Sequence, residues 1–337
     1  MKKLFAFLLT LTISICFSQN FAVSKKINLP GDGGWDYLAV DDVNQNLFVS
    51  HGDVVNVANL KTNTFIATIE DTKGVHGIAI ANDLNKAFIS CGKDNSISIV
   101  DLLNFKLLDK VKIEGQKPDA ILYDKFSKQV FIFNAKSNNA TVLDAVSNKT
   151  IKNLPLVGKP EFAVTNDKGL IYVNIEDENQ MKTIDTKTLL VVATFSILPG
   201  DEPSGLAFDK SNNRLFSVCG NKMMVVVDAK SGKIIQNIPI GDGCDGVVFD
   251  TKRKLIFAAN GEGTMTVIKQ NSKDSYSVLD TVSTQKGART IALNPSSGTI
   301  YTTTPDFGAK PEPTPENPKP RSSITPNSFS ILVIEKK

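Results

Sequence analysis

The sequence predicts an all-β fold of seven repeated units, each made of four strands, arranged radially around one axis. Two observations predict it. Seven six-residue segments align at steps of 40, 43, 42, 43, 41 and 44 residues. Between them lie runs of aromatic and β-branched residues, interrupted by Gly, Asn, Asp and Ser at turn positions. A period of about 40–45 residues with only strand-like content is typical of the blades of a β-propeller rather than of helical solenoids.

The four strands of each unit can be read in order. The aligned first strands are DYLAVD from Asp36, HGIAIA from His76, DAILYD from Asp119, EFAVTN from Glu161, SGLAFD from Ser204, DGVVFD from Asp245 and RTIALN from Arg289. Second strands follow, as in NLFVSHG and KAFISCG, then third strands such as SISIVD (96–101) and fourth strands such as IIQNIPI (234–240). Short hairpin turns join them.

The seventh unit is incomplete in the linear sequence. SFSILVIEKK (328–337) supplies its third strand, and nothing follows to supply a fourth. FAVSKKINL (21–29) is a spare strand before the first unit. We therefore predict a seven-bladed propeller of four-stranded blades, in which the N-terminal strand completes the last blade and removes exposed edges.

The first residues form a targeting segment. Lys2 and Lys3 precede an apolar run (4–17) that is too short for a comfortable membrane span. We expect a secretory signal peptide at 1–18 and a single propeller domain at 19–337, exported to the periplasm or secreted. A lipoprotein anchored through Cys16 is less favoured, because Ile15 is bulky where such signals need a small residue. No later segment is apolar enough to span a membrane.

Composition excludes several functions. Loss of Lys2 and Lys3 lowers the formal net charge from +3 to +1, and no basic stripe with interleaved aromatic residues is present, so nucleic-acid binding is not expected. Covalent haem needs C-x-x-C-H, which is absent. The remaining cysteines, Cys91, Cys219 and Cys244, are not spaced as zinc ligands and are expected to be small buried hydrophobic residues. We expect a monomer.

The first column of the alignment predicts the site. Its members are Asp36, His76, Asp119, Glu161, Ser204, Asp245 and Arg289, of which six are ionisable. Charged side chains beside the innermost strands are tolerated if they line the mouth of the central channel. His51, at the end of a second strand, is expected on the same face. The predicted ligand-binding residues are therefore the six ionisable members, His51 and Phe307, and His51, His76 and Arg289 are the catalytic candidates.

Oxygen donors on this face suggest a divalent cation. The candidate ligands are Asp119, Asn134, Glu161, Asp245 and Asn260. They favour calcium or magnesium over zinc, because two histidines without a third ligand nearby are a weak zinc signal. The alternative is a solvated ring whose charges pair with one another, with Arg289 balancing its acidic neighbours.

A loop at 305–327 holds seven prolines and joins the second and third strands of the last unit. It emerges on the face of the ring, where it is either a solvated spacer or a lid. As a lid, its Phe307, Lys310 and Arg321 could reach a bound ligand. The acidic turn at 176–178 is interpreted mainly as solvated.

The motifs NLFVSHG, LIYVN, KPDAILYD, KPEFAVTND, VVVDAKSGK and KGARTIALNP resemble the YVTN repeat, and the chain from about residue 21 to its end resembles the YncE-like propellers. That resemblance implies the fold and leaves the chemistry open, because related propellers include lactonases, lyases and non-catalytic binding proteins. Two functions remain. One is an exported propeller that binds a small molecule, a metal ion or a protein partner at the channel mouth. The other is a metal-assisted lactonase or lyase; the absence of G-x-S-x-G disfavours a covalent hydrolase.

Overall fold

The structure is a computed structural model that describes residues 21–314, 318 and 320–337. The expected signal peptide at 1–18, with Cys16, lies outside the described residues, as do positions 315–317 and 319 of the proline-rich loop. No helix in the described part of the chain is long and apolar enough to cross a membrane.

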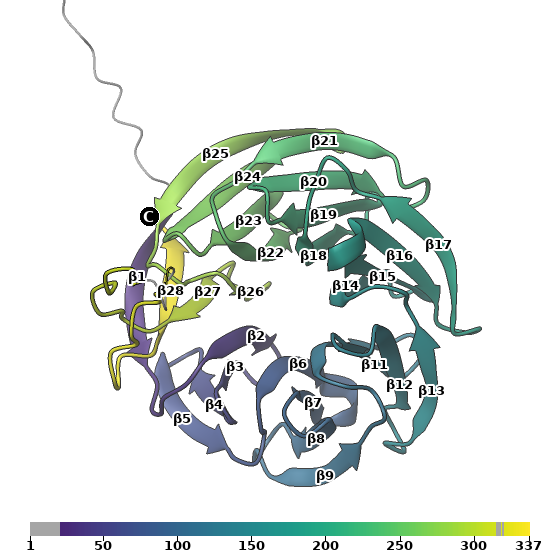
Figure 1. Cartoon of the computed structure of the whole chain (residues 1–337), viewed down its shortest axis with the longest axis horizontal. Helices are drawn as coiled ribbons and strands as arrows, with labels where there is room; N and C mark the ends of the chain where they lie inside the picture. Colours follow the sequence, from purple (N-terminus) through teal and green to yellow (C-terminus); the bar gives the residue numbers. More distant parts are fainter. Residues whose placement is uncertain (1–20, 315–317, 319) are drawn as a thin grey trace, which may run out of the picture.

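Seven four-stranded antiparallel sheets surround a central axis (Figure 1). The innermost strands are β2 (Trp35–Asp41), β6 (Val75–Ala81), β10 (Pro118–Asp124), β14 (Pro160–Thr165), β18 (Pro203–Asp209), β22 (Cys244–Asp250) and β26 (Ile291–Leu293). The second strands are β3 (Asn46–His51), β7 (Lys86–Cys91), β11 (Gln129–Asn134), β15 (Leu170–Ile175), β19 (Arg214–Cys219), β23 (Leu255–Asn260) and β27 (Ile300–Thr304).

The outer half of each sheet completes the blade. The third strands are β4 (Val54–Asn59), β8 (Ser96–Asp101), β12 (Asn139–Asp144), β16 (Gln180–Asp185), β20 (Met223–Asp228), β24 (Thr264–Ser272) and β28 (Ser330–Lys336). The fourth strands are β5 (Thr64–Ile69), β9 (Leu107–Lys112), β13 (Thr150–Pro155), β17 (Leu190–Ser196), β21 (Ile234–Pro239), β25 (Ser275–Ser283) and β1 (Phe21–Asn28). Two 3-10 turns, η1 (Asn82–Leu84) and η2 (Glu176–Glu178), interrupt connections between strands.

The two ends of the described chain close the ring. β1 pairs antiparallel with β28, from Phe21 opposite Lys336 to Asn28 opposite Ser330, and Figure 1 shows the first and last strands side by side. Phe21 also packs edge-on against Phe257 of the preceding blade, with ring centroids 5.2 Å apart. The prediction of seven blades, with the N-terminal strand completing the last, is confirmed.

The hydrophobic core is divided among the interfaces between blades. In the described residues, seven apolar clusters form, each from two neighbouring sheets. Phe216 of β19 and Ile256 of β23, for example, share one cluster and are fully buried. Each sheet is therefore apolar on both faces, which explains the near-continuous hydrophobic runs in its strands. Cys91, Cys219 and Cys244 are buried without disulfides, as the sequence predicts.

Aspartates close the turns on the side of the ring opposite the first-column residues. Asp250, at the end of an innermost strand, accepts hydrogen bonds on Oδ1 from the backbone N–H groups of Lys252 and Arg253 at 2.9 and 3.0 Å. Asp144, at the end of a third strand, likewise accepts a hydrogen bond on Oδ1 from the backbone N–H of Ser147 at 2.7 Å. These carboxylates bond their own turns, as Asx turns do. Asp250 and Asp144 thus stabilise the turns that follow their own strands.

Candidate functional site

A bulge at the start of the innermost strands aims the first-column side chains at the axis. Trp35 pairs with His51, and the register then shifts so that Leu38 pairs with Val49. The same shift recurs at the start of β6, β10, β14, β18 and β22. The extra residue of a bulge re-aims a side chain. Ser50 of the second strand accepts the hydrogen bond of the freed Asp36 N–H at 2.9 Å.

Small residues let neighbouring inner strands approach at this level. A Cβ on Gly77 would lie 2.8 Å from both the carbonyl oxygen of Asp119 and Cγ2 of Ile121. A Cβ on Gly205 would lie 2.7 Å from the carbonyl oxygen of Asp245. Glycine therefore directly follows the ring residue in both blades because the next blade occupies the space of a side chain.

The residues of the first column line one cavity of about 250 Å³, which we call the cup. The cup is lined by Asp36, His76, Asp119, Glu161, Ser204, Asp245 and Arg289, together with Tyr37, Lys117, Lys159 and Glu176. Residues separated by about forty positions in the chain are thus neighbours around one axis. Whether they bind a ligand stays a prediction.

Tyr37, which lines the cup, contacts a second aromatic ring. Tyr37 of β2 and Phe162 of β14 meet across the channel, with ring centroids 5.3 Å apart. Both also line an apolar cavity of about 270 Å³ within the channel, together with Leu206, Val247 and Phe249. Burial raises the pKa of Tyr37 well above its ordinary value, and the charge of Asp36 adds to this. The channel is therefore divided into a polar compartment and an apolar one.

His76 sits between two carboxylates. Its Nδ1 lies 2.7 Å from Oδ2 of Asp36 and 3.6 Å from Oδ1 of Asp119. Burial lowers the pKa of His76, but the hydrogen bond to Asp36 and the negative charges of Asp119 and Asp36 outweigh it, so the pKa lies above its ordinary value. Burial in turn raises the pKa of Asp119, and His76 only partly opposes this rise.

Glu161 and Lys159 form the second group. Lys159 Nζ lies 2.8 Å from Oε1 of Glu161 and also pairs with Glu176. Burial raises the pKa of Glu161 to about 8, with a further contribution from the charge of Asp119, and Lys159 opposes the rise. Glu161 therefore keeps its proton near neutral pH, which is unusual for a carboxyl group and typical of functional sites.

Arg289 connects the cup to its rim. Its Nε lies 2.6 Å from Oδ2 of Asp245. Its terminal nitrogen donates to the carbonyl oxygen of Trp35 at 3.0 Å, and its guanidinium lies over the Trp35 ring, 5.0 Å from the centroid. The indole Nε1 of Trp35 donates to the carbonyl oxygen of Gly287 at 3.2 Å. These contacts hold the guanidinium in one orientation.

The cup has more acidic than basic groups. Five carboxylates line it, against three permanently charged basic side chains and one histidine. Partial burial makes unpaired negative charge costly. Burial is the first cause of the raised pKa values of Asp119 and Glu161, and it opposes the rise at His76; the negative charge of neighbouring carboxylates raises the pKa of all three groups.

Four predicted site residues do not line the cup: Phe307, which lines another pocket described below, and His51, Asn134 and Asn260. His51 is 1% exposed, stacks on Phe329 with centroids 3.9 Å apart, and has Nδ1 3.0 Å from Oδ1 of Asn56. Asn134 and Asn260 are fully buried and donate to threonines of the adjoining strand. The last residues of the second strands face the interfaces between blades, one strand away from the axis. Of the predicted metal ligands, Asp119, Glu161 and Asp245 line the cup.

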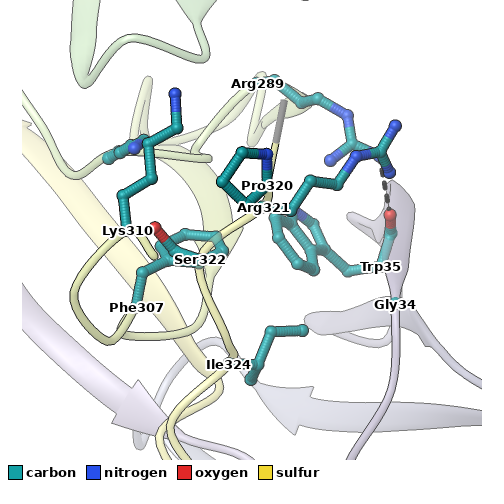
Figure 2. Close-up of a pocket in the computed structure, with 10 residues that line it drawn as sticks. Gly34, Trp35, Arg289, Phe307, Lys310, Pro320, Arg321, Ser322 and Ile324 are labelled. Atoms are coloured by element: carbon teal, nitrogen blue, oxygen red, sulfur yellow. Dashed lines mark hydrogen bonds between the residues drawn. The ribbon is translucent and has the colours of Figure 1, made fainter. Parts of the chain in front are cut away.

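The predicted lid residues gather in a different cavity. Phe307, Lys310 and Arg321 line a pocket of about 570 Å³ beneath the proline-rich loop, together with Trp35 and Arg289 (Figure 2). We call it the loop pocket. It shares Arg289 with the cup. The loop thus lies on the face of the ring, as its position between β27 and β28 predicts.

Several cup residues were not predicted as site residues. Lys117 and Lys159 each stand two positions before a ring residue, in the motifs KPD and KPE, so their recurrence was a usable signal. Glu176 belongs to the turn interpreted as solvated, and only its contact with Lys159 brings it to the cup. Tyr37 directly follows Asp36, and nothing local shows that it crosses the channel.

No model of a known protein family matches the chain, and no curated protein sequence matches it. Solved structures match its fold. A chain of Kuenenia stuttgartiensis hydrazine synthase is 16% identical with a TM-score of 0.70, over 81% of this chain and 93% of that one. A chain of a mitotic checkpoint complex is 14% identical with a TM-score of 0.75, over 89% and 95%. Such identities show the fold alone: this chain is a seven-bladed β-propeller.

Proposed function

We propose that this protein is an exported propeller, related to the YncE-like YVTN-repeat proteins, that binds a small ligand at the channel mouth. The observation that carries the proposal is the cup: a cavity at the channel axis in which carboxylates outnumber basic groups. Concave sites with a few converging polar groups and shifted pKa values are the usual places for ligands. The export signal and the repeat motifs of the sequence support the location and the relationship.

The chemistry of the cup favours a ligand that is cationic or rich in hydrogen-bond donors. Ionised carboxylates only accept hydrogen bonds, so hydroxyl, ammonium or metal groups complement them. Asp119 is the clearest acceptor, since it is 7% exposed and its carboxylate faces His76 at 3.6 Å. A bound cation would neutralise the carboxylates of the cup, which otherwise tend to bind protons because they are buried close together.

A metal-assisted lactonase or lyase is the second candidate. Asp36, His76 and Asp119 offer ligand atoms that all lie within 4.8 Å of one another, which fits one divalent cation. A cation there would polarise a lactone carbonyl. With the cation on Asp36 and Asp119 alone, His76, whose Nδ1 lies 2.7 Å from Oδ2 of Asp36, is the group placed to move a proton. Arg289 lines the same cavity and could hold a developing negative charge.

One set of measurements tests both functions. Bound metals are determined in the purified protein, and calcium, magnesium and zinc are titrated by calorimetry into wild type, His76→Ala and Asp119→Asn. Hydrolysis of a γ-lactone is measured in parallel. Glu335→Gln, on an exposed end of β28, is the control.

Cation binding that is lost in both cup variants and kept in the control supports the cup as a binding site, and loss of lactone hydrolysis in the same variants supports the enzyme. Binding that is unchanged in both variants contradicts a cation in the cup. If the cup binds no cation, and added polyols leave the protonation of its carboxyl groups unchanged, the result favours the alternative in which the charged residues of the ring only pair with one another.

A further inference from the structure

We propose that the loop pocket binds an organic anion, a carboxylate or phosphate attached to an aromatic group. The pocket measures about 570 Å³, within the range of about 300–1,000 Å³ of small-molecule sites. It lies next to the cup and has the opposite chemistry. It adds a second compartment to the function proposed above and does not depend on a ligand in the cup.

Four basic side chains converge on the loop pocket. Lys286, Arg289, Lys310 and Arg321 line it, and none of the described lining residues is acidic. Arg289 is paired with Asp245. Within the described part of the chain, Lys286, Lys310 and Arg321 have no carboxylate within 4.0 Å. Like charges brought together without a counter-charge repel one another, so an anion bound among them is stabilised.

Asp306 is an acidic side chain at the start of the loop. It lines an adjoining hollow rather than the loop pocket. Gln285 Nε2 donates to its carboxylate at 2.8 Å. Asp306 shares that hollow with Lys286 and Lys310, but among the described residues its carboxylate forms no ion pair with either lysine and is hydrogen-bonded to Gln285 instead.

Apolar rings form the walls between the cations. Trp35 and Phe307 have ring centroids 5.9 Å apart, with their planes tilted by 55°. Figure 2 shows the two rings in one cavity, with Lys310 above Phe307 and Arg289 beside Trp35, and Ile324 below them. Flat apolar walls with basic groups at the rim match a ligand that is aromatic at one end and anionic at the other.

Backbone hydrogen bonds connect the two arms of the loop. Phe307 and Ile324 form an isolated antiparallel bridge. Gly308 N donates to the carbonyl oxygen of Ser323 at 2.9 Å, and Thr325 N donates to that of Asp306 at 2.9 Å. These bonds join the two arms of the loop, which carry Lys310 and Arg321 to the lining of the pocket. Because the loop is already ordered in the absence of a ligand, binding loses less conformational entropy than it would with a disordered loop.

The protein carries its own reporter for this site, because Trp35 is its single tryptophan. The experiment titrates phenyl phosphate and benzoate into the full mature protein at low ionic strength and follows tryptophan emission. Benzylamine and benzyl alcohol are the matched cationic and neutral probes. We expect saturable changes with the two anions, weakened by added salt, and none with the other two compounds.

Substitutions on the loop separate recognition from folding. Lys310 and Arg321 are exposed, so the double variant Lys310→Gln/Arg321→Gln should fold normally. Removing two charge-assisted hydrogen bonds should weaken phenyl phosphate binding about tenfold or more. Lys25→Gln, an exposed lysine on β1 of the same blade, is the control and should bind as wild type does.

The result that would overturn the proposal is equal binding of benzylamine and benzoate, or phenyl phosphate affinity that is unchanged in the double variant. No change in emission with either anion up to millimolar concentration overturns it as well. Glu161→Gln separates the two sites: it alters the cup and should leave the binding of phenyl phosphate intact. Failure of the cup as a ligand site would then be visible independently of the loop pocket.

Discussion

The protonation of Glu161 makes the stability of this propeller depend on pH in a way that one substitution should remove. The Glu161 side chain is 13% exposed, and burial, with the nearby charge of Asp119, raises its pKa from 4.5 to about 8. In the unfolded chain the same group loses its proton near its ordinary value. Between about pH 5 and about pH 8 the folded state therefore binds one more proton than the unfolded state.

The sign and size follow from proton linkage. When the folded state binds the extra proton, the free energy of unfolding falls as pH rises, by about 1.4 kcal/mol for each pH unit. The favourable contribution is fully present below the unfolded pKa and is lost as pH rises through the folded pKa. Glu161→Gln keeps the shape of the side chain and cannot ionise. Its advantage over wild type should grow across this window to at most about 5 kcal/mol.

The assay is urea unfolding of wild type and Glu161→Gln at several pH values, followed by circular dichroism. The difference between the two curves isolates Glu161, since His76 titrates in both proteins. Glu335→Gln, an exposed glutamate on β28, is the matched control and should run parallel to wild type. Parallel curves for wild type and Glu161→Gln across the whole window would refute a protonated Glu161. A difference infrared spectrum should show its protonated carboxyl band near neutral pH.

Four further outcomes are expected. Because this protein has two histidines, NMR should resolve two imidazole titrations: His76 above its ordinary pKa, held by its acidic neighbours, and His51 below it, through burial; the reverse order would contradict the assignment. Stability linked to His76 should be present at low pH and lost as pH rises through its folded pKa. Gly77→Ala should destabilise the protein by about 1–3 kcal/mol in urea unfolding, because its Cβ meets the Asp119 backbone. Deleting β1 should expose the edge of β28 and cause aggregation, measured by light scattering, whereas an intact, monomeric product would show that closure is dispensable.

Much of the architecture follows from the period alone. A repeat of about forty residues with four strand signals specifies one blade, and seven such repeats specify the ring. The spare strand before the first repeat and the missing strand of the last specify the closure between β1 and β28. The recurring column from Asp36 to Arg289 specifies which side chains share a cavity. These features are local or periodic, so they can be read without coordinates.

Other features depend on contacts between blades. His51 and His76 look alike in the sequence, yet one packs against Phe329 and the other lines the cup. Tyr37 contacts Phe162, and Lys159 pairs with Glu176. No sequence pattern links the two residues of either pair, so neither contact could be predicted from the sequence.

The sequence by itself therefore determined the number of blades, their closure and the membership of the ring, because periodicity and strand pairing are written along the chain. Only the tertiary structure decided that His51, Asn134 and Asn260 stay outside the cup, how burial shifts the pKa values of the carboxyl groups that line it, and that a pocket lined by basic side chains forms beneath the loop. Those properties depend on burial and on distances between segments far apart in the chain, and burial and distance are what set the energy of a charge.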